Sequence, residues 1–167
     1  MPRIAKIKYK DGTVHILEKS GEGSLVESET QHKICADPHP DFRNAMDELV
    51  KHVREILGWP STLYPSRIRI TGVSYSLSED TGVEGAVMSG LVELDASDSP
   101  FSFNTPHLPF EQYSETGVSK LMPEDAVESL NELRREAREF LGGKRSQGDL
   151  FAANDGKARA AGDATIQ

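Results

Sequence analysis

The chain contains a single cysteine, Cys35, among its 167 residues. An internal disulfide and a multi-cysteine zinc site are therefore both excluded. The sequence also has no apolar run of membrane-spanning length, and its opening residues, MPRIAKIKYK, lack the apolar core of a signal peptide. These absences predict a soluble, cytoplasmic protein with no membrane partner.

Positive charge is also scarce, since the chain carries a net charge of −8. A chain this acidic lacks the broad basic surface of a nucleic-acid binder, so we expect no strong direct binding to nucleic acid. The N-terminal segment is a local exception, and we interpret it as a solvated strand face, with a phosphate-contacting patch as the alternative. Its basic residues are Arg3, Lys6, Lys8, Lys10 and Lys19, accompanied only by Asp11 and Glu18.

Catalytic and cofactor-binding patterns are missing as well. Gly21-Glu22-Gly23 is not a phosphate loop, because the glycine pattern is incomplete and no Lys-Ser/Thr follows. His107 has no nucleophile or acid partner implied by spacing. The alternating set Cys35, Asp37, His39 and Asp41 suggests a metal site, but two prolines interrupt it and a helix entry explains it more simply. We therefore expect no metal, no cofactor and a binding protein rather than an enzyme.

Apolar periodicity in the first half predicts three strands and a helix. Residues 3–9 and 13–19 form a hairpin around the turn Asp11-Gly12, and residues 25–35 form a half-exposed third strand. A helix is predicted over residues 40–57, because apolar residues recur there at spacings of three and four. That stripe consists of Phe42, Ala45, Met46, Leu49, Val53, Ile56 and Leu57.

The second half repeats the order. Residues 66–78 form a strand whose change of parity requires a bulge at Thr71-Gly72. Residues 83–95 are apolar on both parities, which predicts a central strand covered on both faces. A short strand lies near 101–104, and a helix runs over 123–141 with an apolar stripe. The stripe consists of Ala126, Val127, Leu130, Leu133, Ala137, Phe140 and Leu141.

These elements predict an α+β protein with an antiparallel sheet and two helices in the order βββα-βββα. The compact domain spans residues 1–142. Residues 143–167 form a flexible tail, because their composition provides too little apolar surface to offset the entropy of ordering.

Aromatic residues and prolines alternate in the segment 98–113, DSPFSFNTPHLPFEQY. A rigid loop of this kind either forms a groove for peptides or nucleobases, or crosses the sheet and covers the core. The structural interpretation is favoured. The groove candidates are Phe101, Phe103, His107, Phe110 and Tyr113.

The tail carries the most informative segment, Gln147-Gly148-Asp149-Leu150-Phe151. An isolated Leu-Phe pair in a polar tail has no core to join, which is typical of a linear motif that folds onto a partner. The segment resembles the clamp-binding peptide of bacterial DNA-processing proteins. That resemblance implies that Gln147 hydrogen-bonds at a small subsite, that Leu150 and Phe151 fill the main apolar pocket, and that Asp149 lies at the rim. Gly148 stands where leucine is commoner.

The chain as a whole also resembles small uncharacterised temperate-phage proteins encoded among replication and recombination genes. The resemblance spans Arg69–Leu94, the segment from Ser99 to His107, and the tail. It implies no activity but a phage context, which fits recruitment of a host clamp in the bacterial cell. The leading hypothesis is a non-enzymatic accessory protein of DNA replication or recombination, held on the host sliding clamp by Gln147–Phe151 and in contact with other replication or repair proteins. Two alternatives stay open: an anti-defence protein that sequesters a nucleotide signal or blocks a nuclease, and a clamp-tethered nuclease or hydrolase.

Overall fold

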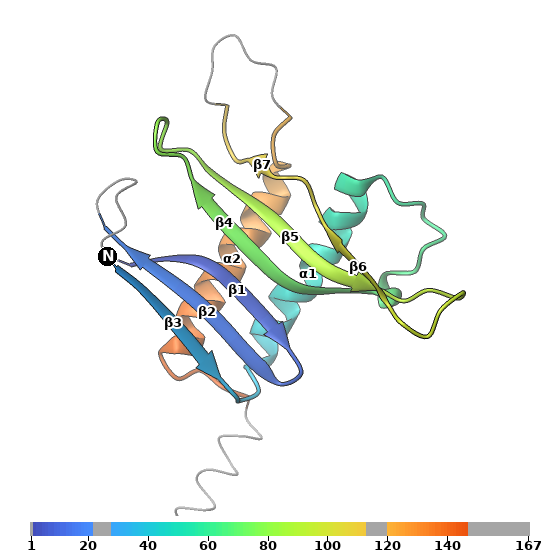
Figure 1. The fold of residues 1–167 in the computed structure, drawn as a ribbon, viewed down its shortest axis with the longest axis horizontal. Helices are drawn as coiled ribbons and strands as arrows, with labels where there is room; N and C mark the ends of the chain where they lie inside the picture. Colours follow the sequence, from blue (N-terminus) through green and yellow to red (C-terminus); the bar gives the residue numbers. More distant parts are fainter. Residues whose placement is uncertain (1, 22–27, 113–119, 147–167) are drawn as a thin grey trace, which may run out of the picture.

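The computed structural model describes residues 2–21, 28–112 and 120–146. It contains one antiparallel sheet with both long helices on the same face, which confirms the predicted α+β class (Figure 1). The elements are β1 (Arg3–Lys10), β2 (Thr13–Ser20), β3 (Ser28–Ile34), α1 (Pro40–Leu57), the 3-10 helix η1 (Pro65–Arg67), β4 (Ile68–Leu77), β5 (Glu84–Val92), β6 (Phe101–Asn104), β7 (Leu108–Pro109) and α2 (Glu124–Leu141).

The two halves of the chain have the same topology. The strand order is β3-β2-β1-β4-β5-β6, so each half is a three-stranded meander and the first strands of the two halves pair in the middle. The short β7 pairs with β5. Helix α1 lies against β4 of the second half, α2 lies against β1 of the first half, and the helices contact each other. The halves therefore interlock into one domain around a shared core.

Local sequence signals set the strand geometry. Asp11 and Gly12 both have positive φ, of 53° and 74°, as a tight turn between twisted strands requires. In β4 the register shifts between Ile70 and Gly72, which confirms the predicted bulge. The bulge lets Ile70 and Val73 both face the core, although they have opposite parity in the sequence.

The first helix begins and ends where the sequence predicts. The ring of His39 accepts a hydrogen bond from the backbone N–H of Asp41 (3.1 Å), Pro40 occupies the first turn, and Gly58 ends the helix with a φ of 65°. Helix α2 follows Pro123 and carries Glu124 and Asp125 in its first turn, where they favour the helix dipole.

The core lies between the two helices and one face of the sheet. Residues at the centre of each predicted helix stripe, such as Leu49 and Leu130, are fully buried. The prediction that the strand at 83–95 is covered on both faces is wrong, because the described helices cover only one. Ala86, Met88 and Val92 of β5 are buried against the helices, whereas Val87 and Leu91 are half-buried on the opposite face.

Polar groups also join the layers. The Tyr75 hydroxyl of β4 donates a hydrogen bond to the carbonyl oxygen of Leu130 in α2 (2.7 Å). His52 of α1, which is 1% exposed, lies with its Nε2 3.0 Å from the Ser129 hydroxyl of α2. Burial lowers the pKa of His52, and this effect outweighs the opposing attraction of Asp125. The neutral imidazole is thus the form that fits between the helices.

Candidate functional site

The clamp-motif residues Gln147, Asp149, Leu150 and Phe151 lie outside the described residues, as does Tyr113. The structure does describe the segment that leads directly to the motif, and this segment ends at Ser146. Contacts to the domain therefore extend four residues past Gly142.

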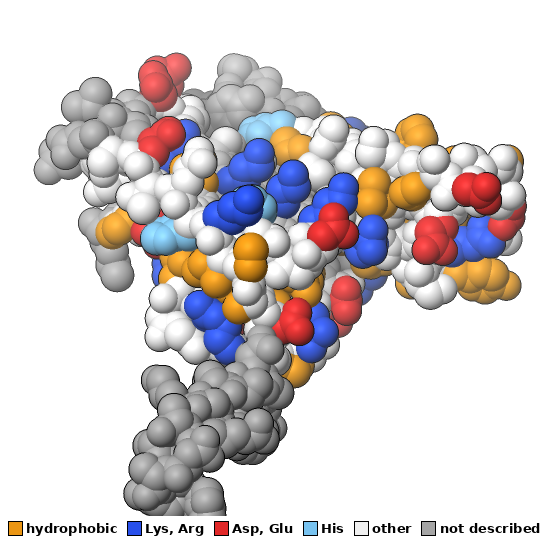
Figure 2. All heavy atoms as spheres, turned by 60° about the horizontal axis from the view of Figure 1, so that its bottom comes forward, with side chains coloured by type: hydrophobic (Ala, Val, Ile, Leu, Met, Phe, Trp, Pro, Cys, Tyr) orange, Lys and Arg blue, Asp and Glu red, His pale blue; other side chains and the backbone are white. Residues whose placement is uncertain are grey.

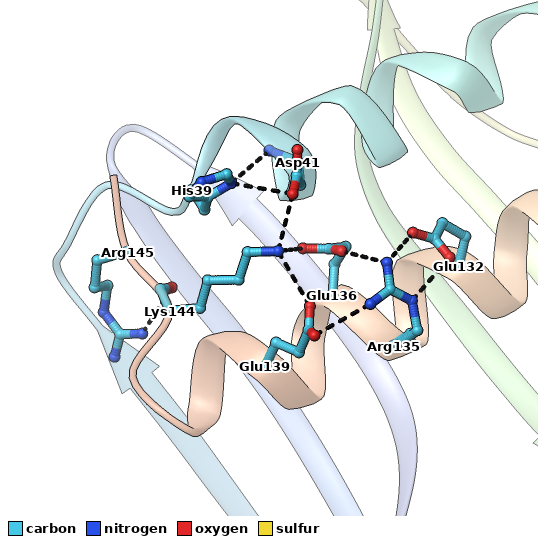
Figure 3. Close-up of polar contacts among 8 residues, drawn as sticks. All are labelled: His39, Asp41, Glu132, Arg135, Glu136, Glu139, Lys144 and Arg145. Carbon is cyan, nitrogen blue, oxygen red and sulfur yellow. Dashed lines mark hydrogen bonds and ion pairs between the residues drawn. The ribbon is translucent and has the colours of Figure 1, made fainter. Parts of the chain in front are cut away.

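Lys144 is held by an ion-pair network between the two helices (Figure 3). Its ammonium nitrogen lies 2.9 Å from Oδ2 of Asp41, 3.1 Å from Oε1 of Glu136 and 3.2 Å from Oε2 of Glu139. The hydrogen bond from Lys144 is the main reason that the pKa of Asp41 lies below its usual value, and the same bond raises the pKa of Lys144. With their pKa values shifted in these directions, Asp41 and Glu139, whose pKa Lys144 also lowers, are carboxylates at neutral pH and attract the Lys144 ammonium.

Glu136 is the buried centre of this network. Its side chain is 1% exposed, and its second oxygen accepts a hydrogen bond from Arg135 (2.8 Å). Arg135 in turn binds Glu132 and Glu139 on the outer side of α2 (Figure 3). Leaving a buried carboxylate unpaired would cost free energy, so the charged donors Lys144 and Arg135 hold the Glu136 side chain in one position.

The next two residues are attached through the backbone and an aromatic ring. Arg145 forms an isolated antiparallel bridge with Pro38, and the Ser146 N–H donates to the carbonyl oxygen of Asp37 (3.2 Å). The Arg145 guanidinium lies 3.7 Å from the centre of the Phe140 ring. The chain therefore leaves the described domain from a point that is fixed beside the entry to α1.

The described aromatic candidates of segment 98–113 differ in burial and do not share one groove. The Phe103 ring is buried and packs edge-to-face against Trp59, with centroids 5.0 Å apart. Phe110 is half-buried against the core, whereas Phe101 is 55% exposed. His107 is exposed and bonds to the sheet instead.

His107 has a partner that the sequence did not reveal. Its Nε2 lies 2.7 Å from the Ser76 hydroxyl of β4, and a Cβ on Gly85 would come within 2.4 Å of the same nitrogen. A glycine at position 85 thus lets the imidazole lie directly on the strand. The alternation of β4 predicts that Ser76 is exposed, but only the return of the chain from β6 brings His107 to it. Among the described residues, no Asp or Glu side chain bonds to the second ring nitrogen of His107.

The face of the sheet opposite the helices, here called the open sheet face, carries a row of lysines. Lys6, Lys8 and Lys10 occupy alternate positions of β1 and are exposed. Two hollows of about 280 and 430 Å³ lie on either side of β1, and both are lined by Lys6 and Lys8. Figure 2 shows Lys and Arg side chains gathered in the middle of one face of the molecule, with His side chains near them.

The alternating set at the entry to α1 does not converge. Cys35 lies near the Thr13 hydroxyl (3.6 Å), while His39 caps the helix. Among the described residues no group of three or more His, Cys, Asp or Glu side chains is arranged to hold a metal ion. Within the same residues, no helix has the length and apolar character needed to cross a membrane.

Comparison of the chain with family models, curated proteins and solved structures finds no match.

Proposed function

We propose that this protein is a non-enzymatic accessory factor of phage-type DNA replication or recombination, held on the bacterial sliding clamp by Gln147–Phe151. The domain supplies a folded body that the motif brings to the clamp. The partners would be the clamp itself and other replication or repair proteins gathered there.

The observation that supports this proposal is the anchoring of the residues just before the motif. Ser146 is bonded to Asp37, and Lys144 is held by three carboxylates. Leu150 follows Ser146 by four residues, so its Cα lies within about 14 Å of that of Ser146 even in a fully extended chain. A short motif at the end of a fixed attachment point would keep the whole domain next to the clamp surface.

The expected affinity is modest. Leu150 and Phe151 would provide most of the apolar contact, while ordering of the segment on binding reduces the net free energy. We expect a dissociation constant of about 1 μM, equivalent to about −8 kcal/mol.

Calorimetry with purified clamp tests the proposal. The Leu150→Ala/Phe151→Ala variant should lose detectable binding, because truncation of a hot-spot residue costs about 2 kcal/mol or more. Asp149→Ala is the matched control from the same motif and should retain most of the affinity, since a rim charge mainly affects association rate. Intact protein without measurable affinity at high micromolar concentration would refute the tether.

A further inference from the structure

The three lysines of β1 have no charge partner in the part of the chain that the structure describes. Each is exposed, and none forms an ion pair with an acidic residue there. Neither of the hollows beside them is lined by a described Asp or Glu. The open sheet face thus presents unneutralised positive charge on a protein whose net charge is −8.

Hydrogen-bonding side chains surround this row. Across β4, β5 and β6 lie Thr71, Ser74, Ser89, Ser102 and Asn104, and across β2 and β3 lie His15, Gln31 and Lys33. The Ser89 hydroxyl donates to the side-chain oxygen of Asn104 (2.6 Å), which orders that pair. Both hollows are at or below the lower part of the range for small-molecule sites, about 300–1,000 Å³, so the face suits an extended ligand better than an enclosed one.

We propose that the open sheet face binds single-stranded nucleic acid, with the backbone phosphates on Lys6, Lys8 and Lys10. Alternate residues of an antiparallel strand are about 6.8 Å apart, a spacing close to that of successive phosphates in an extended single strand. The polar side chains on either side of β1 are then placed to bond base edges, which a single strand leaves accessible.

An acidic protein is the competing ligand for such a face. Stable protein interfaces centre on buried aromatic or arginine anchors and the pockets that receive them. Among the described residues, Phe103 is the only Phe, Tyr or Trp that lines the two hollows, and its ring is buried against Trp59. With no aromatic platform among these described residues, the lysines offer phosphate contacts and the polar side chains offer hydrogen bonds, which favours nucleic acid.

The absence of a stacking platform also sets the strength of binding. Stacking of a base on an aromatic side chain contributes about 1–3 kcal/mol in typical single-strand binders. Binding here should be weak and governed by salt, with a slope of log K against log[salt] of about −2 for three phosphate contacts. Weak affinity is sufficient at a clamp, where tethering raises the effective concentration of DNA.

The test is fluorescence anisotropy with labelled oligothymidine and oligouridine of about 20 nucleotides, at salt concentrations from about 50 to 200 mM. One variant is Lys6→Gln/Lys8→Gln/Lys10→Gln. The matched control, Arg43→Gln/Lys51→Gln/Arg138→Gln, removes the same charge from exposed positions on the helices. Circular dichroism melting checks that both variants fold.

Intact protein and the helix control should bind with the same salt slope, and the β1 variant should lose at least tenfold in affinity. Comparison of the two oligonucleotides separates DNA from RNA as the preferred strand. Equal loss in both variants would mean that net charge alone governs binding and would overturn the proposal, as would no binding at the lowest salt. Displacement by polyglutamate at the same charge concentration would assign the face to an acidic protein instead. Clamp is absent from this assay, so its result does not depend on the tether.

Discussion

The helical layer and the open sheet face both carry many charged side chains, but they use them differently. On α2, which has six acidic and three basic residues, Arg134, Arg135 and the neighbouring Lys144 are all in ion pairs. On β1, four basic residues are accompanied by no acidic one. The helical charges connect parts of the domain to each other, whereas the β1 charges are directed to solvent.

The difference shows that net charge is a poor guide to the surface of this molecule. The value of −8 is a sum over regions of opposite character, since α1 and α2 together carry ten acidic and six basic residues, whereas β1 carries four basic residues and no acidic one. Removing charged side chains from the helical network should alter stability, and removing them from the open face should alter binding.

Truncation of core side chains should cause the largest loss of stability. Leu49→Ala and Leu130→Ala should each lower the free energy of unfolding by about 2–5 kcal/mol, because both side chains are fully buried between the helices and the sheet. Urea denaturation measures this. A loss below about 1 kcal/mol would mean that the site collapses around the smaller residue. A peptide of residues 144–155 should bind clamp as intact protein does.

The buried carboxylate of the helical network comes next. Glu136→Ala should cost about 1.5–3 kcal/mol, since it removes hydrogen bonds between charged groups, including one of the three carboxylates that hold Lys144. The matched control is Glu132→Ala on the same helix, whose side chain is 49% exposed and whose loss should cost about 1 kcal/mol or less. Equal losses in denaturant titrations of the two variants would show that burial adds nothing to the network.

The stability of the helical layer should depend on pH through His52. Burial holds the pKa of His52 below the value of about 6.5 expected in the unfolded chain, so as pH falls the unfolded state binds the proton first. Its contribution is therefore fully present above pH 6.5 or so and is lost as pH falls below that value. Stability measured between pH 7 and 5 should fall more steeply in the native protein than in His52→Gln. Identical slopes would contradict this assignment.

Substitutions on the open sheet face should cause the smallest change in stability. Lys6→Gln/Lys8→Gln/Lys10→Gln should leave the free energy of unfolding within about 0.5 kcal/mol per site, because exposed side chains without charge partners contribute little to folding. Thermal melting checks this. A drop of several kcal/mol would show that the lysine stems support the sheet and that the contrast between the two faces is false.

Much of the fold could be predicted because its signals are local. The turn at Asp11-Gly12, the bulge at Thr71-Gly72 and the bounds of α1 each depend on a few neighbouring residues. The burial of Glu136 and His52 was not predictable from apolar periodicity, because a polar side chain enters the core only when a partner from another element satisfies it. The contact of Ser76 with His107 spans 31 residues and required the tertiary path of the chain. The motif at 147–151 is inferred from the sequence, and the structure describes only the residues just before it, which are bonded to the domain.

The tether is tested most directly by an amide-resolved NMR titration of isotope-labelled protein with unlabelled clamp. The account predicts that the resonances of Gln147–Phe151 change or broaden first, followed by those of Ser146 and Asp37 beside the attachment point. Amides of the helical core, such as those of Leu49 and Leu130, should change only with the overall slowing of tumbling. Unchanged resonances at Leu150 and Phe151 in the presence of saturating clamp would contradict it.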